Sequence, residues 1–439
     1  MPMRFNDRLP PPWPAAHPTR SIDSLNPFKY NYLRRHNNFL FHAALMPKRP
    51  CVHINCVYGK GGLMETLHKA FVGYGWQNGV MIVIGLVLIV LAIKKEYEPM
   101  LLLPIGFGCI LANLPLAAVL GTAEDPGFLQ VLYNAGITTE LFPLLIFIGI
   151  GAMIDFSPLL KQPVMIFFGA AAQLGIFMAM LLAICANGLI PGIFDLKEAA
   201  AIGIIGAADG PTTIYVGNLF APDYIGPLSV AAYSYMAMVP IIQPPVIRLM
   251  TTRQERRIRM ETDYGKPVRR PVLIAFPIIV TLVVGFVAPQ GVPLVGALMF
   301  GNLVRECGVL KRLSSAAQNE LASVVTILLG ITIGSSMSGN KFLQLNTLLI
   351  LLIGFLAFVF DTAGGVLFAK LVNLFLKKKI NPMIGAAGIS AFPMSARVVQ
   401  KMAQKEDPSN FILMPAIGAN VSGQVGSIIA GAVLISLLS

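Results

Sequence analysis

Apolar stretches of about 20 residues, separated by short polar segments, recur along the chain from Gly79 to the C-terminus. A helix of this length crosses the hydrocarbon layer of a bilayer. The pattern predicts an all-α polytopic membrane protein, with apolar segments at about 79–93, 98–118, 141–155, 163–187, 198–221, 225–250, 271–288, 290–305, 321–337, 345–375, 382–400 and 409–438.

Two of these segments, 198–221 and 382–400, carry glycine and proline in their interiors. Proline removes a backbone donor and glycine permits unusual dihedral angles, so each helix is expected to break or to be re-entrant. The glycine, proline and hydroxyl positions that begin at Gly203 recur from Gly385, 182 residues later. Interrupted segments at corresponding positions of two halves are typical of transporters built from an inverted structural repeat.

Clusters of basic residues predict the orientation of the chain. The segment from Arg253 to Arg270 holds seven Lys/Arg against three acids, and shorter basic runs lie at Lys94–Lys95 and Lys377–Lys379. Basic loops face the cytoplasm. Segment 198–221 is then expected to open to the outer side and segment 382–400 to the inner side, so the two halves are inverted.

Composition supports the membrane assignment, because 55% of the residues are hydrophobic and only 12% are charged. Of the net charge of +12, residues 1–63 carry nine Lys/Arg against two Asp. We expect this part to be a disordered tail or an artefactual upstream extension, because Met64 opens a more conventional beginning. Basic loops explain the remaining charge without a nucleic-acid partner. The predicted division is a tail at 1–63, a membrane repeat at 64–250, a basic cytoplasmic loop at 251–270 and a second membrane repeat at 271–439.

Asp209 is the first candidate for chemistry, because it lies in the apolar segment 198–221 and is followed by Gly210 and Pro211. A buried carboxylate costs several kcal/mol, so an acid within a membrane is by default a candidate ion or proton site. A helix that breaks here leaves free carbonyl oxygens beside the carboxylate. The compatible alternative is that Asp209 only caps the helix that follows.

Neutral oxygen donors gather in the second interrupted segment, where Asn381, Gly385 and Ser390 precede Pro393. Amide, hydroxyl and freed backbone oxygens suit a monovalent cation and carry too little charge for tight divalent binding. Paired with Asp209 across an inverted repeat, they predict a site for Na+ or a proton. Asn381 is also consistent with a turn or a cap at the end of a loop.

Three further residues are weaker candidates. Tyr233 and Tyr235 follow Asp209 by roughly one helical hairpin. The phenol of Tyr235 can bind a carboxylate, coordinate a cation or donate a proton, but an aromatic residue near a membrane boundary is also an ordinary interface anchor. Asp361 is a second acid in an apolar segment, for which the first half offers no matching polar partner.

Several motifs resemble one family, the beta subunits of the biotin-dependent, sodium-pumping decarboxylases that act on oxaloacetate, methylmalonyl-CoA or glutaconyl-CoA. The resemblance runs from about Glu98 to the end and rests on EPMLLLPIGFG, GIGAMIDFSPLL, AAAIGIIGAADGPTTIY, VAAYSYMAMVPIIQPP, FGNLVRECGV and NPMIGAAGISAFPMSARV. By this resemblance, the essential residues of the family are Asp209, Tyr235, Asn381, Gly385 and Ser390. Residues 1–63 have no counterpart.

The resemblance implies a function for the chain within a complex. A carboxyltransferase (alpha) subunit loads CO2 onto biotin held by a biotin carrier, and this subunit decarboxylates the carboxybiotin and exports Na+. It further implies a small gamma-type membrane subunit, several copies of this chain per complex and a bacterial inner-membrane location. The carboxylic acid that the complex consumes is a property of the carboxyltransferase.

Two other functions are consistent with the residues. The chain is alternatively a stand-alone Na+/H+-coupled secondary transporter with the same inverted repeat, which would exchange sodium without a biotin subunit. It is otherwise a membrane anchor for soluble subunits, in which case Asp209, Asn381 and Ser390 are dispensable.

Overall fold

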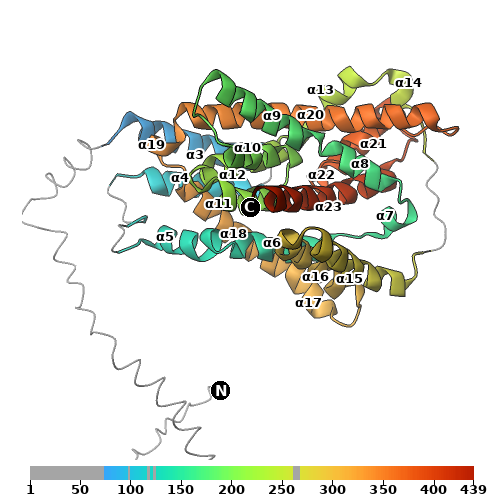
Figure 1. Ribbon diagram of the computed structural model, residues 1–439, viewed down its shortest axis with the longest axis horizontal. Helices are drawn as coiled ribbons and strands as arrows, with labels where there is room; N and C mark the ends of the chain where they lie inside the picture. Colours follow the sequence, from blue (N-terminus) through green and yellow to red (C-terminus); the bar gives the residue numbers. More distant parts are fainter. Residues whose placement is uncertain (1–73, 97–98, 116–118, 122–124, 261–266) are drawn as a thin grey trace, which may run out of the picture. The chain divides into compact units, whose positions relative to one another are not determined.

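The computed structural model describes residues 74–96, 99–115, 119–121, 125–260 and 267–439, all within the unit Ala70–Ser439. The predicted tail at 1–63 and the expected beginning at Met64 lie outside the described residues. The described part is helical (Figure 1) and contains no strand beyond one isolated bridge between Gly121 and Pro126.

Most helices of the first half lie in the predicted apolar segments, whereas others, among them Phe128–Tyr133, Asn134–Thr138 and Arg253–Arg256, lie outside them. The helices of this half are α3 (Trp76–Lys95), α4 (Pro99–Asn113), α5 (Phe128–Tyr133), η2 (Asn134–Thr138), α6 (Leu141–Met153), α7 (Ser157–Lys161), α8 (Met165–Ala172), α9 (Leu174–Leu189), α10 (Leu196–Ile204), η3 (Ile205–Ala207), α11 (Gly210–Phe220), η4 (Pro222–Tyr224), α12 (Ile225–Ala237), α13 (Val239–Met250) and α14 (Arg253–Arg256).

The second half begins after the basic loop. Its helices are α15 (Arg270–Val287), η5 (Pro289–Gly291), α16 (Val292–Glu306), α17 (Lys311–Ala316), η6 (Ala317–Leu321), α18 (Ala322–Ser335), α19 (Gly339–Phe342), α20 (Leu345–Phe375), α21 (Met383–Ala386), α22 (Met394–Glu406) and α23 (Leu413–Leu438). In Figure 1, α20 is the long orange helix and α23 the dark red one.

Helix length and composition confirm an all-α polytopic membrane protein. In the described part, the helices that are long and apolar enough to cross a membrane are Trp76–Lys95, Met165–Leu189, Arg270–Val287, Lys311–Ser335, Leu345–Phe375 and Leu413–Leu438. These six become up to eight if each of two bent pairs is one span. The bends are 61° between Phe128–Thr138 and Leu141–Met153, and 67° between Pro222–Ala237 and Val239–Met250.

Both predicted interruptions are present. The first helical run ends at Ala207 and resumes at Gly210, whereas α21 ends at Ala386 and α22 begins at Met394. We call residues 196–220 the first broken segment and residues 383–406 the second broken segment. A further interruption, at Gln173 between α8 and α9, was not predicted.

Glycines allow helices of the two halves to touch backbone to backbone. A Cβ on Gly301 of α16 would lie 2.0 Å from the carbonyl oxygen of Ile148 in α6, and Gly151 of α6 faces α16 as closely. The α4–α18 crossing is built in the same way from Gly108 and Gly334. Close glycine crossings are a common means of packing helices where lipid supplies little hydrophobic driving force.

Helix α20 connects two distant ends of the structure. Near its start, Asn346 donates from Nδ2 to the Tyr224 hydroxyl at 2.7 Å, just after the first broken segment. Near its end, Lys370 pairs with Glu255 of α14 at 3.1 Å. A rise of 1.5 Å per residue separates Asn346 from Lys370 by about 36 Å, more than the hydrocarbon thickness of roughly 30 Å.

The second broken segment ends at the same end of α20 as the basic loop. Glu406, the last residue of α22, accepts from Arg256 of α14 at 2.9 Å, and Asp407 pairs with Arg259 at 2.8 Å. The first broken segment therefore leaves at one end of α20 and the second at the other.

The glycine crossing predicts opposite effects of one substitution at two sites on α16. We expect Gly301→Ala to lower the thermal unfolding midpoint of the purified protein, because forcing a methyl group into close packing costs about 1–3 kcal/mol. At Gly296, nothing lies within 4 Å of the position that a methyl group would take. Gly296→Ala should leave the midpoint unchanged or raise it, since alanine stabilises a helix by about 0.5–1 kcal/mol over glycine. Equal midpoints for the two variants would contradict the crossing.

Candidate functional site

The first broken segment presents Asp209 at a sharp backbone turn. Ala208 has a left-handed conformation with φ 53°, and Asp209 is extended at the N-cap of α11. A left-handed alanine costs about 1–2 kcal/mol, so the surrounding packing must enforce it. Pro211 lies in the first turn of α11, where its missing N–H removes no helical hydrogen bond. The chain thus stops one helix, turns, and begins the next at the acid.

Three side chains donate to the same carboxylate oxygen of Asp209. Its Oδ2 accepts from the Thr212 hydroxyl at 2.7 Å, the Ser427 hydroxyl at 2.8 Å and Gln424 Nε2 at 3.0 Å. The Asp209 side chain is 3% exposed. Asp209 stands at the N-cap position of α11, but its side chain makes no cap hydrogen bond there, because the Thr212 contact comes from the hydroxyl group. Capping also leaves the two donors from α23 unexplained.

The residues of α23 at this site were not predicted from the sequence. Asn420, Gln424 and Ser427 lie four and three residues apart, so they form a polar stripe on one face of an apolar helix. Asn420 donates from Nδ2 to the Ile389 carbonyl oxygen at 2.6 Å, while its Oδ1 is buried without a partner. This spacing of polar residues within an apolar helix is the sequence signal that could have identified them as site residues.

The two broken segments meet in the structure. The backbone N–H of Ser390 donates to the carbonyl oxygen of Ala207 at 3.2 Å, two residues before Asp209. The Ser390 hydroxyl donates to the Gly423 carbonyl oxygen of α23 at 2.8 Å. One helix, α23, therefore contacts both interruptions.

Asn381 and Gly385 have structural contacts of their own. Asn381 Nδ2 donates to the carbonyl oxygens of Arg256 and Ile258 at 3.0 and 2.9 Å, and its Oδ1 accepts from the Met383 N–H. These bonds agree with the turn-or-cap alternative and join the second broken segment to the basic loop. A Cβ on Gly385 would lie 1.9 Å from the Gly365 carbonyl oxygen of α20, so this position requires glycine.

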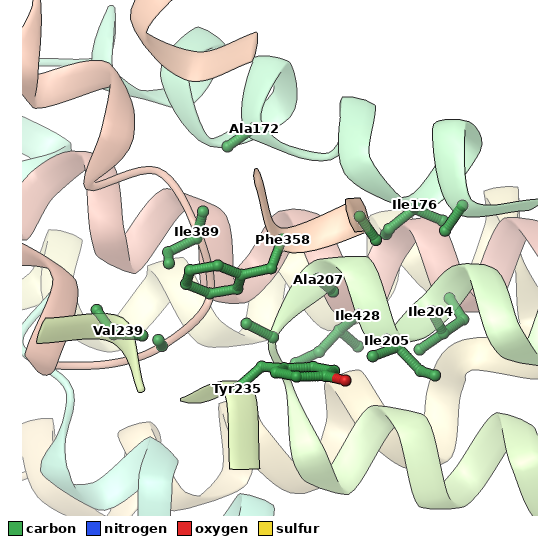
Figure 2. Packing of buried hydrophobic residues seen from close by; sticks show 14 of the residues in the cluster. Ala172, Ile176, Ile204, Ile205, Ala207, Tyr235, Val239, Phe358, Ile389 and Ile428 are labelled. Carbon is green, nitrogen blue, oxygen red and sulfur yellow. The ribbon is translucent and has the colours of Figure 1, made fainter. Parts of the chain in front are cut away.

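Tyr235 and Tyr233 occupy different environments. The Tyr235 hydroxyl donates to the Leu351 carbonyl oxygen of α20, and Figure 2 shows its ring in the apolar cluster with Ile205 and Ile428. The Tyr233 ring packs on Gly210, which follows Asp209. A Cβ atom on Gly210 would lie 2.1 Å from this ring. The Tyr233 hydroxyl is buried without a partner.

Two glutamine side chains cross between the halves. One, from α23 after the second broken segment, binds the first broken segment; the other, from α13 after the first broken segment, binds the second. Gln424 reaches Asp209, as described above. Gln243 of α13 is fully buried and donates from Nε2 to the Ala386 carbonyl oxygen at 2.8 Å and to the Ser395 hydroxyl at 2.9 Å. Gln243 was not predicted from the sequence to be a site residue, whereas Ser395 is one of the hydroxyl positions of the predicted repeat.

The second buried acid has a separate environment. Asp361 of α20 accepts from the Gly175 N–H at the start of α9 at 3.1 Å, and its Oδ2 has no partner. Its side chain is 0% exposed. We call Asp209 with its three donors Thr212, Gln424 and Ser427 the Asp209 cluster. Among the described residues, no hydrogen bond joins Asp361 to this cluster.

The chemistry of the Asp209 cluster suits a small monovalent cation or a proton. It combines one carboxylate with hydroxyl and amide oxygens, and Asn420 adds a buried carbonyl oxygen without a partner one helical turn from Gln424. Such donors are oxygen ligands with little total charge, which disfavours a tightly held divalent ion. No group of three or more His, Cys, Asp or Glu side chains in the described residues is arranged to hold a metal ion.

Comparisons with known proteins place these motifs in one family. A family model described as the Na+-transporting oxaloacetate decarboxylase beta subunit matches residues 77–438. The methylmalonyl-CoA decarboxylase subunit beta of Veillonella parvula is 48% identical over 84% of this chain and 96% of its own length. The glutaconyl-CoA decarboxylase subunit beta of Acidaminococcus fermentans is 47% identical over 84% and 96%. The probable oxaloacetate decarboxylase beta chain of Vibrio cholerae is 43% identical over 82% and 95%.

Proposed function

The chain belongs to the family of Na+-transporting oxaloacetate decarboxylase beta subunits, and we propose that it is the membrane subunit of a sodium-translocating, biotin-dependent decarboxylase. It decarboxylates carboxybiotin presented by a partner subunit and exports Na+. The observation that carries this proposal is the buried Asp209 carboxylate at a helix break, held by donors from α23. The stand-alone transporter is not favoured, because the relatives are decarboxylase subunits.

The proposed complex has several parts. A carboxyltransferase (alpha) subunit and a biotin carrier supply the carboxybiotin, a small gamma-type subunit joins them to the membrane part, and several copies of this chain assemble together. The membrane is the bacterial inner membrane. Its lipid surrounds the apolar helices that the structure leaves exposed, such as α15 with Phe286 and Val287.

The chemical step releases CO2 and consumes one proton. The C–N bond of N-carboxybiotin breaks with its electron pair on the ureido nitrogen, CO2 leaves, and the nitrogen takes up a proton. The carboxylate charge spreads as the bond breaks, so a dry site favours cleavage. Tyr235, or an acid in exchange with Asp209, is the proposed proton donor.

The ion step uses the cluster around Asp209. We assign Na+ binding to Asp209, Asn381, Gly385 and Ser390, with a proton replacing Na+ on the carboxylate in the alternate state. Ser390 supports the assignment through its bond to Ala207, beside Asp209. Asn381 and Gly385 contribute by holding the second broken segment against the basic loop and α20. Moving one charge against 100 mV requires about 2.3 kcal/mol.

The inverted repeat belongs to the same proposal. It is supported by the glycine crossings of α6 with α16 and of α4 with α18, each of which pairs a helix of the first half with a helix of the second. The exits of the two broken segments at opposite ends of α20 support it as well. Alternating exposure of the site to the two sides of the membrane then requires only a movement of one part against the other.

Asp209→Asn tests the ion site. The amide keeps the size and hydrogen bonding of the side chain but removes the exchangeable charge. We expect sodium transport and sodium-stimulated decarboxylation to be lost together, while the complex still assembles, because a neutral amide is cheaper to bury than a charge. Carboxybiotin decarboxylation is measured against Na+ concentration in the purified complex.

The same measurement includes graded variants and a control. Asn381→Ala and Ser390→Ala should raise the Na+ concentration needed for half-maximal activity, because each removes a neutral ligand or its support. Asp361→Asn changes the other buried acid and should retain sodium-dependent turnover. Full sodium-dependent turnover in Asp209→Asn would eliminate the proposed site.

The two tyrosines should give different phenotypes. Tyr235→Phe removes the proposed proton donor, so turnover should fall by about tenfold or more with little change in the Na+ requirement. Tyr233→Phe removes the unpartnered phenol beside Asp209 and should raise the Na+ concentration for half-maximal activity. Steady-state kinetics at several Na+ concentrations separates the two effects. Identical kinetic changes in both variants would refute this division of roles.

Opposite accessibility tests the topology. With the native cysteines replaced, Asp223→Cys after the first broken segment should react with an impermeant maleimide from outside. Pro408→Cys after the second broken segment should react only from the cytoplasmic side, in inverted vesicles. The assay compares labelling in intact cells with labelling in vesicles, and reaction of both positions from one side would exclude the inverted arrangement.

A further inference from the structure

A cavity of about 340 Å³ lies where the first broken segment ends, at the end of α20 away from the basic loop. Asp223 of η4 lines it, together with Gly226 of α12 and with Ser336, the residue after α18. We call it the outer cavity, because the proposed topology places this end outside the membrane. A cation that leaves Asp209 for the outer side has to leave at this end.

The lining of the outer cavity offers oxygen atoms without a net charge. Among the described residues that line it, the charged ones are Asp223 and Lys341, one of each sign. Gln130, Tyr133 and Ser338 add neutral amide, phenol and hydroxyl oxygens. A site on a conduction path has to bind its ion weakly enough to let it go. This lining therefore suits the release of Na+ rather than its retention.

One face of α12 runs from the outer cavity to the ion site. Gly226, Ser229 and Tyr233 lie three and four residues apart, so they form a stripe on one face of the helix, which we call the α12 stripe. At its start, a Cβ on Gly226 would lie 2.6 Å from the Ser336 hydroxyl. At its end, the Tyr233 ring packs on the residue that follows Asp209. The helical rise separates the two ends by about 10 Å.

Both hydroxyl groups of the α12 stripe are buried without a partner. The Ser229 side chain is 0% exposed and that of Tyr233 is 2% exposed, and neither hydroxyl oxygen has a hydrogen bond. A buried helical serine can ordinarily donate to the carbonyl oxygen one turn earlier. Buried polar atoms are otherwise almost always hydrogen-bonded, and an exception indicates a place for water or an ion. The stripe thus presents two successive oxygen ligands that the chain itself does not use.

The α12 stripe also lies where two apolar clusters meet. Tyr233 packs in the cluster that contains Ile333 and Met337 near the end of α18. Ala231 and Tyr235 of the same helix pack in the other, larger cluster. In the proposed function, one part of the protein moves against another. A boundary between two clusters opens in such a movement without disrupting the interior of either.

We propose that the α12 stripe is the exit path of Na+, which passes from Asp209 to the Tyr233 hydroxyl, then to the Ser229 hydroxyl, and into the outer cavity. The proposal rests on the proposed function and adds the route on the outer side. Each hydroxyl oxygen replaces part of the water shell of the ion, and the ion regains its water in the outer cavity. The orphaned hydroxyls, the seam between the clusters and the charge balance of the lining all follow from this role.

The first test measures access to Ser229 from outside. In the complex without native cysteines, Ser229→Cys should react with an impermeant methanethiosulfonate reagent added to right-side-out vesicles. External Na+ at several times its Kd should slow this reaction about fivefold relative to choline, because the ion and the reagent occupy the same path. Asp223→Cys at the mouth is the positive control. The matched control is Ala231→Cys, which is equally buried on another face of α12 and should not react.

A second measurement keeps the proposal testable if the cysteine variants fail to assemble. Ser229→Ala removes a hydroxyl that has no partner, so the thermal unfolding midpoint should stay the same or rise. Transport of radioactive Na+ driven by N-carboxybiotin should fall about tenfold, the effect of one lost ligand. Ser229→Thr restores the hydroxyl and should restore transport. A merely structural role of Ser229 would instead change the midpoint and the transport rate together.

The outcomes separate the exit path from the proposed function. If the wild-type complex moves no Na+ when it is given N-carboxybiotin, the proposed function itself fails. If it does move Na+, full transport in Ser229→Ala or an unreactive Ser229→Cys overturns the path alone. Reaction of Ser229→Cys that external Na+ does not slow would identify a water-filled crevice off the ion route. Equal reaction of Ala231→Cys would mean that the whole helix is loosely packed, which also overturns the path.

Discussion

The structure depends on how one carboxylate is kept in a dry interior. An unpaired charge at the position of Asp209 would cost several kcal/mol, and the chain offsets this cost with three donors on one oxygen. Only Thr212 comes from the same segment. Gln424 and Ser427 come from α23, more than 200 residues later, so the acid is stable only when the two halves are in contact. If Asp209 binds the ion, as proposed above, ion binding depends on the relative position of the halves.

Close backbone contacts make that dependence geometric. Ser390 bonds to Ala207, and a Cβ on Gly423 would lie 1.9 Å from the Gly388 carbonyl oxygen. Gln243 holds the second broken segment from α13 in the way that Gln424 holds the first from α23. Because these contacts are short and partly hydrogen-bonded, a small displacement of either broken segment would change which groups contact the Asp209 carboxylate. Packed interiors respond to such displacements in discrete steps rather than continuously.

One helix joins the second broken segment to the basic loop. Helix α22 begins at the second broken segment and ends at the basic loop, where Arg256 holds Glu406. Its side chains Arg397, Lys401 and Lys405 line a cavity beside α13, and its first turn carries Ser395. In the function proposed here, a movement of this helix would change the second broken segment and the basic loop together.

The sequence by itself determined the membrane class, most of the apolar helices and both helix breaks, and it made Asp209 the first candidate for chemistry. These features are local: apolar length, a glycine or proline in a helix, and an acid among apolar residues are visible in one segment. The motifs also identified the family. Tertiary structure alone decided which side chains surround Asp209, because nothing in the spacing of Asn420, Gln424 and Ser427 says which segment the stripe faces. It also placed Tyr233 rather than Tyr235 beside Asp209 and gave Asn381 its bonds to the basic loop. Partners far apart in sequence are brought together by packing between the halves, and the physical reason is that packing depends on the whole set of helix crossings rather than on any one segment.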